Sequence, residues 1–122
     1  MIIFVEKVLE KEDLLRIVFP EWLFDYFDFV KVDSTAERLD VYLDEKKLIP
    51  SEYRNAPISS HGFTSIYTVQ DFPLRGKEVY LHLRRRKWLL LNTRQIVSLQ
   101  YDFAFEGTRL TKEFVAFLKA TN

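Results

Sequence analysis

The chain has 122 residues, of which 48% are hydrophobic and 30% are charged, and this composition predicts one compact soluble domain. It contains no cysteine, which excludes disulfide scaffolds and cysteine-ligated metal sites and fits a reducing, cytoplasmic compartment. The apolar start Met1–Val5 is too short for a signal peptide or a membrane span. We therefore expect a cytoplasmic protein with no membrane partner and no cofactor.

A net charge of zero hides an uneven distribution of charge along the chain. Residues 1–60 carry 8 basic and 13 acidic side chains, whereas residues 61–122 carry 10 and 5. Between Arg75 and Arg94, seven cations accompany one acid, Glu78. Such a cluster can attract a polyanion to one face, or the acidic half can neutralise it within the fold; the sequence leaves both readings open.

Apolar residues at helical spacing predict a helix over residues 11–26. Pro20 interrupts it, so we expect either one helix ending near Phe19 and a second beginning at Pro20, or one kinked helix. The period then changes to two over Phe29–Val32 and Arg38–Leu43, which predicts a β-hairpin with its turn at residues 33–36. Residues 50–62 are expected to form a surface connection.

A second strand pair is predicted over Phe63–Val69 and Glu78–Arg86, with a third strand over Gln95–Tyr101. Thr108 or Thr111 is expected to cap a final helix. The apolar face expected on that helix comprises Leu110, Phe114, Phe117 and Leu118.

These elements predict an α+β fold, with a small antiparallel β-sheet or hairpins flanked by an N-terminal helical segment and a C-terminal helix. We expect a single domain over residues 1–122. Its parts are an acidic α/β region at 1–50, a basic β-hairpin region at 62–107 and the helix at 108–120.

Sequence motifs of enzymes are absent. A phosphate-loop reading around Lys77 fails because Asp71 and Glu78 stand where a glycine and a serine or threonine are required. The two histidines, His61 and His82, have no patterned partners. We therefore expect a non-enzymatic protein without catalytic or metal-ligating residues.

The basic cluster is the one motif that indicates a function. On a strand, Arg84 and Arg86 would share one face, and Arg85 and Lys87 the other. Guanidinium groups bind phosphates and a neighbouring aromatic ring can stack on a base, so the cluster favours nucleic-acid binding. In the alternative interpretation the arginines solvate a strand end and the tryptophan fills the core. The candidate DNA-binding residues are Arg75, Lys77, Arg84, Arg85, Arg86, Lys87 and Trp88.

The chain resembles the N-terminal region of bacterial insertion-sequence transposases of the Aon type over roughly residues 12–120. The most specific part is the run Gln70–Leu81, which leads into the basic cluster; the segments 19–27, 45–50 and 106–119 also fit. The same core is distantly similar to the zinc-ribbon N-terminal domain of DDE-type transposases. Those relatives carry cysteine pairs where residues 55–61 and 90–95 have none, so zinc is not implied here.

The resemblance implies a DNA-binding module that recognises the terminal repeats of a mobile element and is involved in transposition. It implies no catalysis, because this chain has no counterpart of the catalytic region with its three metal-binding carboxylates. The implied partners are DNA, a catalytic transposase subunit or region, and a second copy in a homodimer. The alternative is a protein–protein assembly module of the transposase, built from the aromatic-rich helices, without direct DNA contact.

Overall fold

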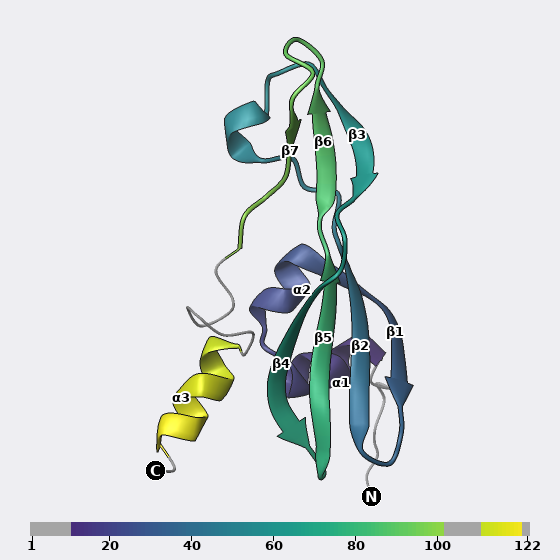
Figure 1. Cartoon of the computed structure of the whole chain (residues 1–122), viewed down its shortest axis with the longest axis vertical. Helices are drawn as coiled ribbons and strands as arrows, with labels where there is room; N and C mark the ends of the chain where they lie inside the picture. Colours follow the sequence, from purple (N-terminus) through teal and green to yellow (C-terminus); the bar gives the residue numbers. More distant parts are fainter. Residues whose placement is uncertain (1–10, 102–110, 121–122) are drawn as a thin grey trace, which may run out of the picture.

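The computed structural model describes residues 11–101 and 111–120, which form two β-sheets and three α-helices (Figure 1). A four-stranded sheet has the strand order β1-β2-β5-β4, and a three-stranded sheet has the order β3-β6-β7. Figure 1 shows the smaller sheet projecting from one end of the larger one. The α+β fold class expected from the sequence is confirmed.

The N-terminal helical segment is divided at the proline, as predicted. Helix α1 spans Lys11–Val18 and helix α2 spans Trp22–Tyr26. Pro20 lies between them, and its carbonyl accepts a hydrogen bond from the Leu23 N–H at 3.1 Å. Since proline has no N–H to donate and suits the start of a helix, the chain turns there and begins a new helix.

Strands β1 (Phe27–Ser34) and β2 (Arg38–Glu45) form the predicted hairpin. Thr35 closes its turn: its hydroxyl oxygen accepts hydrogen bonds from the backbone N–H groups of Glu37 and Arg38. Short polar side chains that bond to neighbouring backbone groups favour such turns. The hairpin therefore forms where the alternating pattern and the turn residues indicate it.

Strands β4 (Tyr67–Leu74) and β5 (Lys77–Arg84) form the second hairpin. Its first strand was predicted over Phe63–Val69, which is wrong in its bounds, because β4 begins at Tyr67 and continues to Leu74. Its turn consists of Arg75 at φ 53° and Gly76 at φ 79°. Two consecutive residues with positive φ are typical of the tight turns whose twist matches that of paired strands. The hairpins then join through β2 and β5, which pair in parallel, a pairing that the sequence did not predict.

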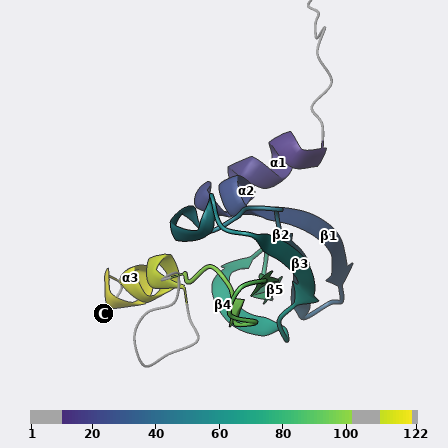
Figure 2. The same cartoon turned by 90° about the horizontal axis from the view of Figure 1, so that it is seen from above.

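One hydrophobic core fills the space between the four-stranded sheet and the N-terminal helices. Alternate residues of the central strands point into it, and α2 supplies Leu23 and Phe24. Figure 2 shows the sheet curving, with α1 and α2 along one side and α3 beside β4. The opposite face of the sheet carries polar and aromatic side chains that are partly buried. The buried strand residues are Phe27, Val41, Leu43, Val69, Val79, Leu81 and Leu83.

The second sheet corrects three predictions. Residues 50–62, expected as a surface connection, contain a 3-10 helix at Ser51–Tyr53 and strand β3 at Ile58–Phe63. The strand expected over Glu78–Arg86 ends at Arg84, and β6 (Arg86–Leu90) continues in the other sheet. The third strand is only Ile96–Val97 (β7), because the chain then leaves the sheet and Tyr101 returns to the larger core. Sequence periodicity cannot show that one long hairpin serves two sheets.

Helix α3 spans Lys112–Ala120, and Thr111 is the capping residue, because its hydroxyl oxygen accepts a hydrogen bond from the Phe114 N–H at 3.2 Å. The expected apolar face is confirmed at Phe114, which is buried and packs against the Phe72 ring, whereas Leu118 is 39% exposed. Thr108, Leu110 and the side chain of Phe117 lie outside the described residues.

Candidate nucleic-acid interface

Arg84 is the last residue of β5, and its charge is neutralised across the parallel pair. Its guanidinium donates two hydrogen bonds to the Asp44 carboxylate, both 2.7 Å long, and lies 4.3 Å from the Phe63 ring centroid. These hydrogen bonds raise the pKa of Arg84. The sequence left open whether acidic side chains neutralise the basic cluster within the fold, and at Arg84 they do.

Arg85 and Arg86 connect the two sheets. The Arg85 guanidinium donates to the Leu99 carbonyl at 2.9 Å, and the Arg86 guanidinium donates to the Glu45 carbonyl at 3.0 Å. The backbone N–H of Arg86 also donates to the Glu45 carboxylate, which is fully buried. Both arginines thus hold the junction together, in addition to any role at the surface.

Trp88 and Lys87 differ in their surroundings on β6. Trp88 is only 3% exposed, so its ring supports the sheet and is not accessible for stacking on a base. The Lys87 side chain is partly exposed and forms no hydrogen bond or ion pair with another described residue. Alternation along the strand accounts for this difference, because neighbouring side chains point to opposite faces.

Arg75 and Lys77 lie at the opposite end of β5 from Arg84. Lys77 and Arg84 are seven positions apart on an extended strand, a span of about 23 Å. Arg75 is exposed in the hairpin turn, and the Lys77 amino group donates to the Ser34 hydroxyl at 2.6 Å. The seven candidate residues therefore do not form one continuous track of charge.

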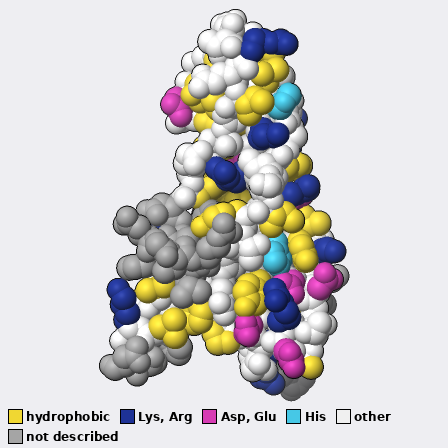
Figure 3. Space-filling model, in the orientation of Figure 1, with side chains coloured by type: hydrophobic (Ala, Val, Ile, Leu, Met, Phe, Trp, Pro, Cys, Tyr) yellow, Lys and Arg dark blue, Asp and Glu magenta, His cyan; other side chains and the backbone are white. Residues whose placement is uncertain are grey.

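The structure instead gathers positive charge around the smaller sheet. We call residues 47–66 and 85–100 the basic lobe: they contain six lysine or arginine residues and one glutamate. The four strands of the larger sheet contain four basic and seven acidic residues. Figure 3 shows this segregation, with acidic side chains gathered over the larger sheet. Lys47 and Arg54 were not among the predicted site residues; both are exposed, Lys47 in the connection that leaves β2 and Arg54 in the segment that leads into β3.

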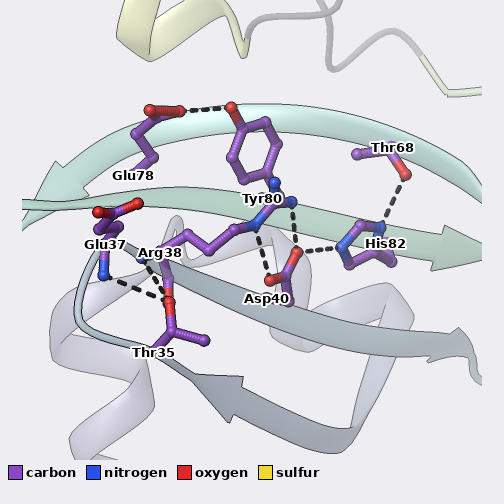
Figure 4. Close-up of polar contacts among 8 residues, drawn as sticks. All are labelled: Thr35, Glu37, Arg38, Asp40, Thr68, Glu78, Tyr80 and His82. Atoms are coloured by element: carbon purple, nitrogen blue, oxygen red, sulfur yellow. Dashed lines mark hydrogen bonds and ion pairs between the residues drawn. The ribbon is translucent and has the colours of Figure 1, made fainter.

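A polar network lies on the face of the larger sheet opposite the core (Figure 4). His82 joins Thr68 and Asp40, at 2.7 Å on each side, and Asp40 accepts two hydrogen bonds from Arg38. Arg38 in turn lies over the Tyr80 ring, 4.0 Å from its centroid. The parallel pairing of β2 with β5 creates this network, because Asp40 lies on β2 and His82 lies on β5. No motif in the sequence indicates a contact between residues 42 positions apart.

Replacing Asp40 by asparagine is expected to lower the free energy of unfolding at pH 7 by about 1 to 2 kcal/mol, since its partners lose a charged acceptor that is largely shielded from water. Hydrogen bonds from Arg38, and then from His82, hold the pKa of Asp40 below its usual 3.8. The ionised group therefore stabilises the fold above that pH, and this contribution is lost as the pH falls through the lowered pKa. Urea denaturation of both proteins between about pH 2 and pH 7 measures this.

Asp33→Asn is the matched control for this substitution. Asp33 pairs with Asp40 in the β1–β2 register, but its side chain is 58% exposed beside Lys31. The same loss of charge should therefore cost less than about 0.5 kcal/mol. Equal losses in the two variants at every pH would contradict the stabilising role of the network.

Within residues 11–101 and 111–120, no three histidine or acidic side chains converge as metal ligands would. In the same ranges no helix is long and apolar enough to cross a membrane. No protein-family model, curated protein or solved structure matches this chain.

Proposed function

We propose that this protein is a non-enzymatic DNA-binding module whose contact surface is the basic lobe. The observation that carries the proposal is the segregation of charge between the two sheets, six cations against one acid in the basic lobe. A surface of one sign attracts a polyanion even when the whole molecule is neutral. Phosphate contacts supply most of the sequence-independent affinity of such proteins for DNA.

Four cations of the basic lobe are the proposed DNA contacts. None of their side chains forms a hydrogen bond or ion pair with another described residue, and they come from separate segments of the lobe. Arg85 and Arg86 already donate to backbone carbonyls and serve mainly to position the lobe. The four are Lys47, Arg54, Lys87 and Arg94.

Recognition of the terminal repeats of an insertion sequence is the narrower form of this proposal. It rests on the resemblance of the Gln70–Leu81 run and the basic cluster to transposase N-terminal regions. The competing assembly module would use the aromatic residues of the helices. Phe24 and Phe114 are at least nine-tenths buried within this chain, as is Phe19 between α1 and α2, whereas Tyr26 is 40% exposed. The burial of most of these rings favours the DNA-binding proposal.

Fluorescence anisotropy with labelled duplexes, over a series of salt concentrations, tests the proposal. The variant Arg54→Ala/Lys87→Ala should bind at least about tenfold more weakly, and the slope of log affinity against log salt should fall by about two units. The control Arg75→Ala/Lys77→Ala removes the same charge at the far end of β5 and should bind nearly as the unmodified protein does. Duplexes from the DNA flanking the coding sequence, compared with scrambled ones, test the recognition of element ends.

Two results would count against the proposal. Equal losses in both double variants would mean that net charge alone, and not the basic lobe, drives binding. Absence of binding to any duplex at low salt would remove the proposed function, and light scattering would then test the assembly alternative through self-association.

A further inference from the structure

The loop that joins β6 to β7 forms the far end of the basic lobe, and all of its residues, 91–95, are exposed (Figure 1). The loop is held by the backbone: the Leu91 N–H donates to the Pro57 carbonyl at 2.9 Å, and the Leu90 N–H donates to the Gln95 carbonyl at 2.8 Å. It is therefore a defined turn at the end of a ribbon, supported by both neighbouring strands.

Arg94 occupies a backbone position in this loop that disfavours its own side chain. Its φ is 62°, and its N–H donates to the Leu90 carbonyl at 2.7 Å, which closes the turn. Glycine or asparagine adopts this left-handed conformation more readily than arginine. Residues held in sparsely populated conformations cluster at functional sites, and Arg94 is exposed in this loop.

Several side chains of the loop are of the types that form specific hydrogen bonds to the edges of DNA bases. Arginine bonds to the O6 and N7 atoms of guanine, and asparagine or glutamine to the N6 and N7 atoms of adenine. This loop contains Asn92, Arg94 and Gln95, and all three are exposed. Only the turn between β6 and β7 has to enter the major groove, which is about 12 Å wide, and the two paired strands that it joins are about 4.8 Å apart.

We propose that this loop enters the major groove of duplex DNA and reads base edges, with Arg94 as the residue that determines sequence specificity. The inference rests on the proposed DNA-binding function and adds to it. In this arrangement Lys47, Arg54 and Lys87 contact phosphates and position the lobe, while the loop discriminates among sequences. Phosphate contacts fix orientation but carry no sequence information directly, so the two sets of residues have separable effects.

The experiment selects preferred sites from a library of duplexes with a randomised central segment. Affinities for the selected site and for a scrambled one are then measured with Arg94→Gly. Glycine removes the side chain and suits the positive φ, so Tm should stay the same or rise. Discrimination between the two duplexes should fall roughly 10- to 100-fold, while affinity for the scrambled duplex changes only a few-fold. Lys87→Ala is the comparison and should weaken binding to both duplexes equally.

Each outcome separates this inference from the function on which it rests. Salt-dependent binding without any enriched sequence would overturn base reading by the loop and leave the DNA-binding function intact. If the Arg94→Gly variant still discriminated fully between the selected and the scrambled duplex, the proposed role of Arg94 would be overturned. Absence of binding by the unmodified protein would overturn both proposals.

Discussion

Replacement of Glu45 by alanine is expected to lower the free energy of unfolding by about 3 to 5 kcal/mol. Glu45 ends β2, is fully buried, and accepts hydrogen bonds from the Arg86 N–H and the Tyr101 hydroxyl. Alanine would remove the buried acceptor that both groups share. Because the bond from Arg86 joins the larger sheet to the basic lobe, urea denaturation should show a large loss for a single substitution.

Glu45→Gln isolates the effect of the charge. Burial raises the pKa of Glu45 above its usual 4.5, so the folded protein binds the proton more tightly than the unfolded chain does. Stability relative to the glutamine variant should therefore be greatest below the usual pKa and should fall as the pH rises toward the raised value. This slope is opposite to the one expected for Asp40, and denaturation between about pH 4 and pH 7 measures it. A difference that does not change with pH would contradict the assignment.

Trp88→Ala is expected to destabilise the basic lobe by about 3 to 5 kcal/mol, because it removes a large buried side chain from the middle strand of the smaller sheet and leaves a cavity. Trp88 lies on the middle strand, opposite Ser60 on one side and Val97 on the other, and is separate from the main core cluster. Amide hydrogen exchange should show lost protection on β3 and β6, with smaller changes on β2 and β5. Binding through the basic lobe should be lost with it.

Trp88→Phe is the control that separates packing from polarity. The indole Nε1 of Trp88 is buried, with no hydrogen-bond partner among the described residues. Phenylalanine removes this unsatisfied donor while it keeps an aromatic ring, so the cost should be below about 1.5 kcal/mol. A loss as large as that of the alanine variant would mean that the indole N–H contributes an interaction of its own.

The arginine cluster shows which structural features a local sequence pattern can predict and which it cannot. Alternation along the chain predicted that Arg84 and Arg86 act together, and both guanidinium groups do contact the Phe63 ring. Yet the same pattern assigned them to one strand, whereas Arg85 separates two strands that belong to different sheets. Periodicity describes neighbouring side chains and contains no information on which distant strand will pair beside them.

By itself the sequence determined several local elements: the helix break at Pro20, the first hairpin, a threonine cap for the last helix and the α+β class. Turn chemistry, capping and hydrophobic periodicity act over a few residues, so these features follow from local order. Only the tertiary structure decided which charges are neutralised. The parallel pairing of β2 with β5 sets Asp44 beside Arg84, while the smaller sheet collects Lys47, Arg54 and Lys87 on one lobe. Such contacts join residues about 40 positions apart, and long-range pairing depends on how the whole chain buries its apolar surface.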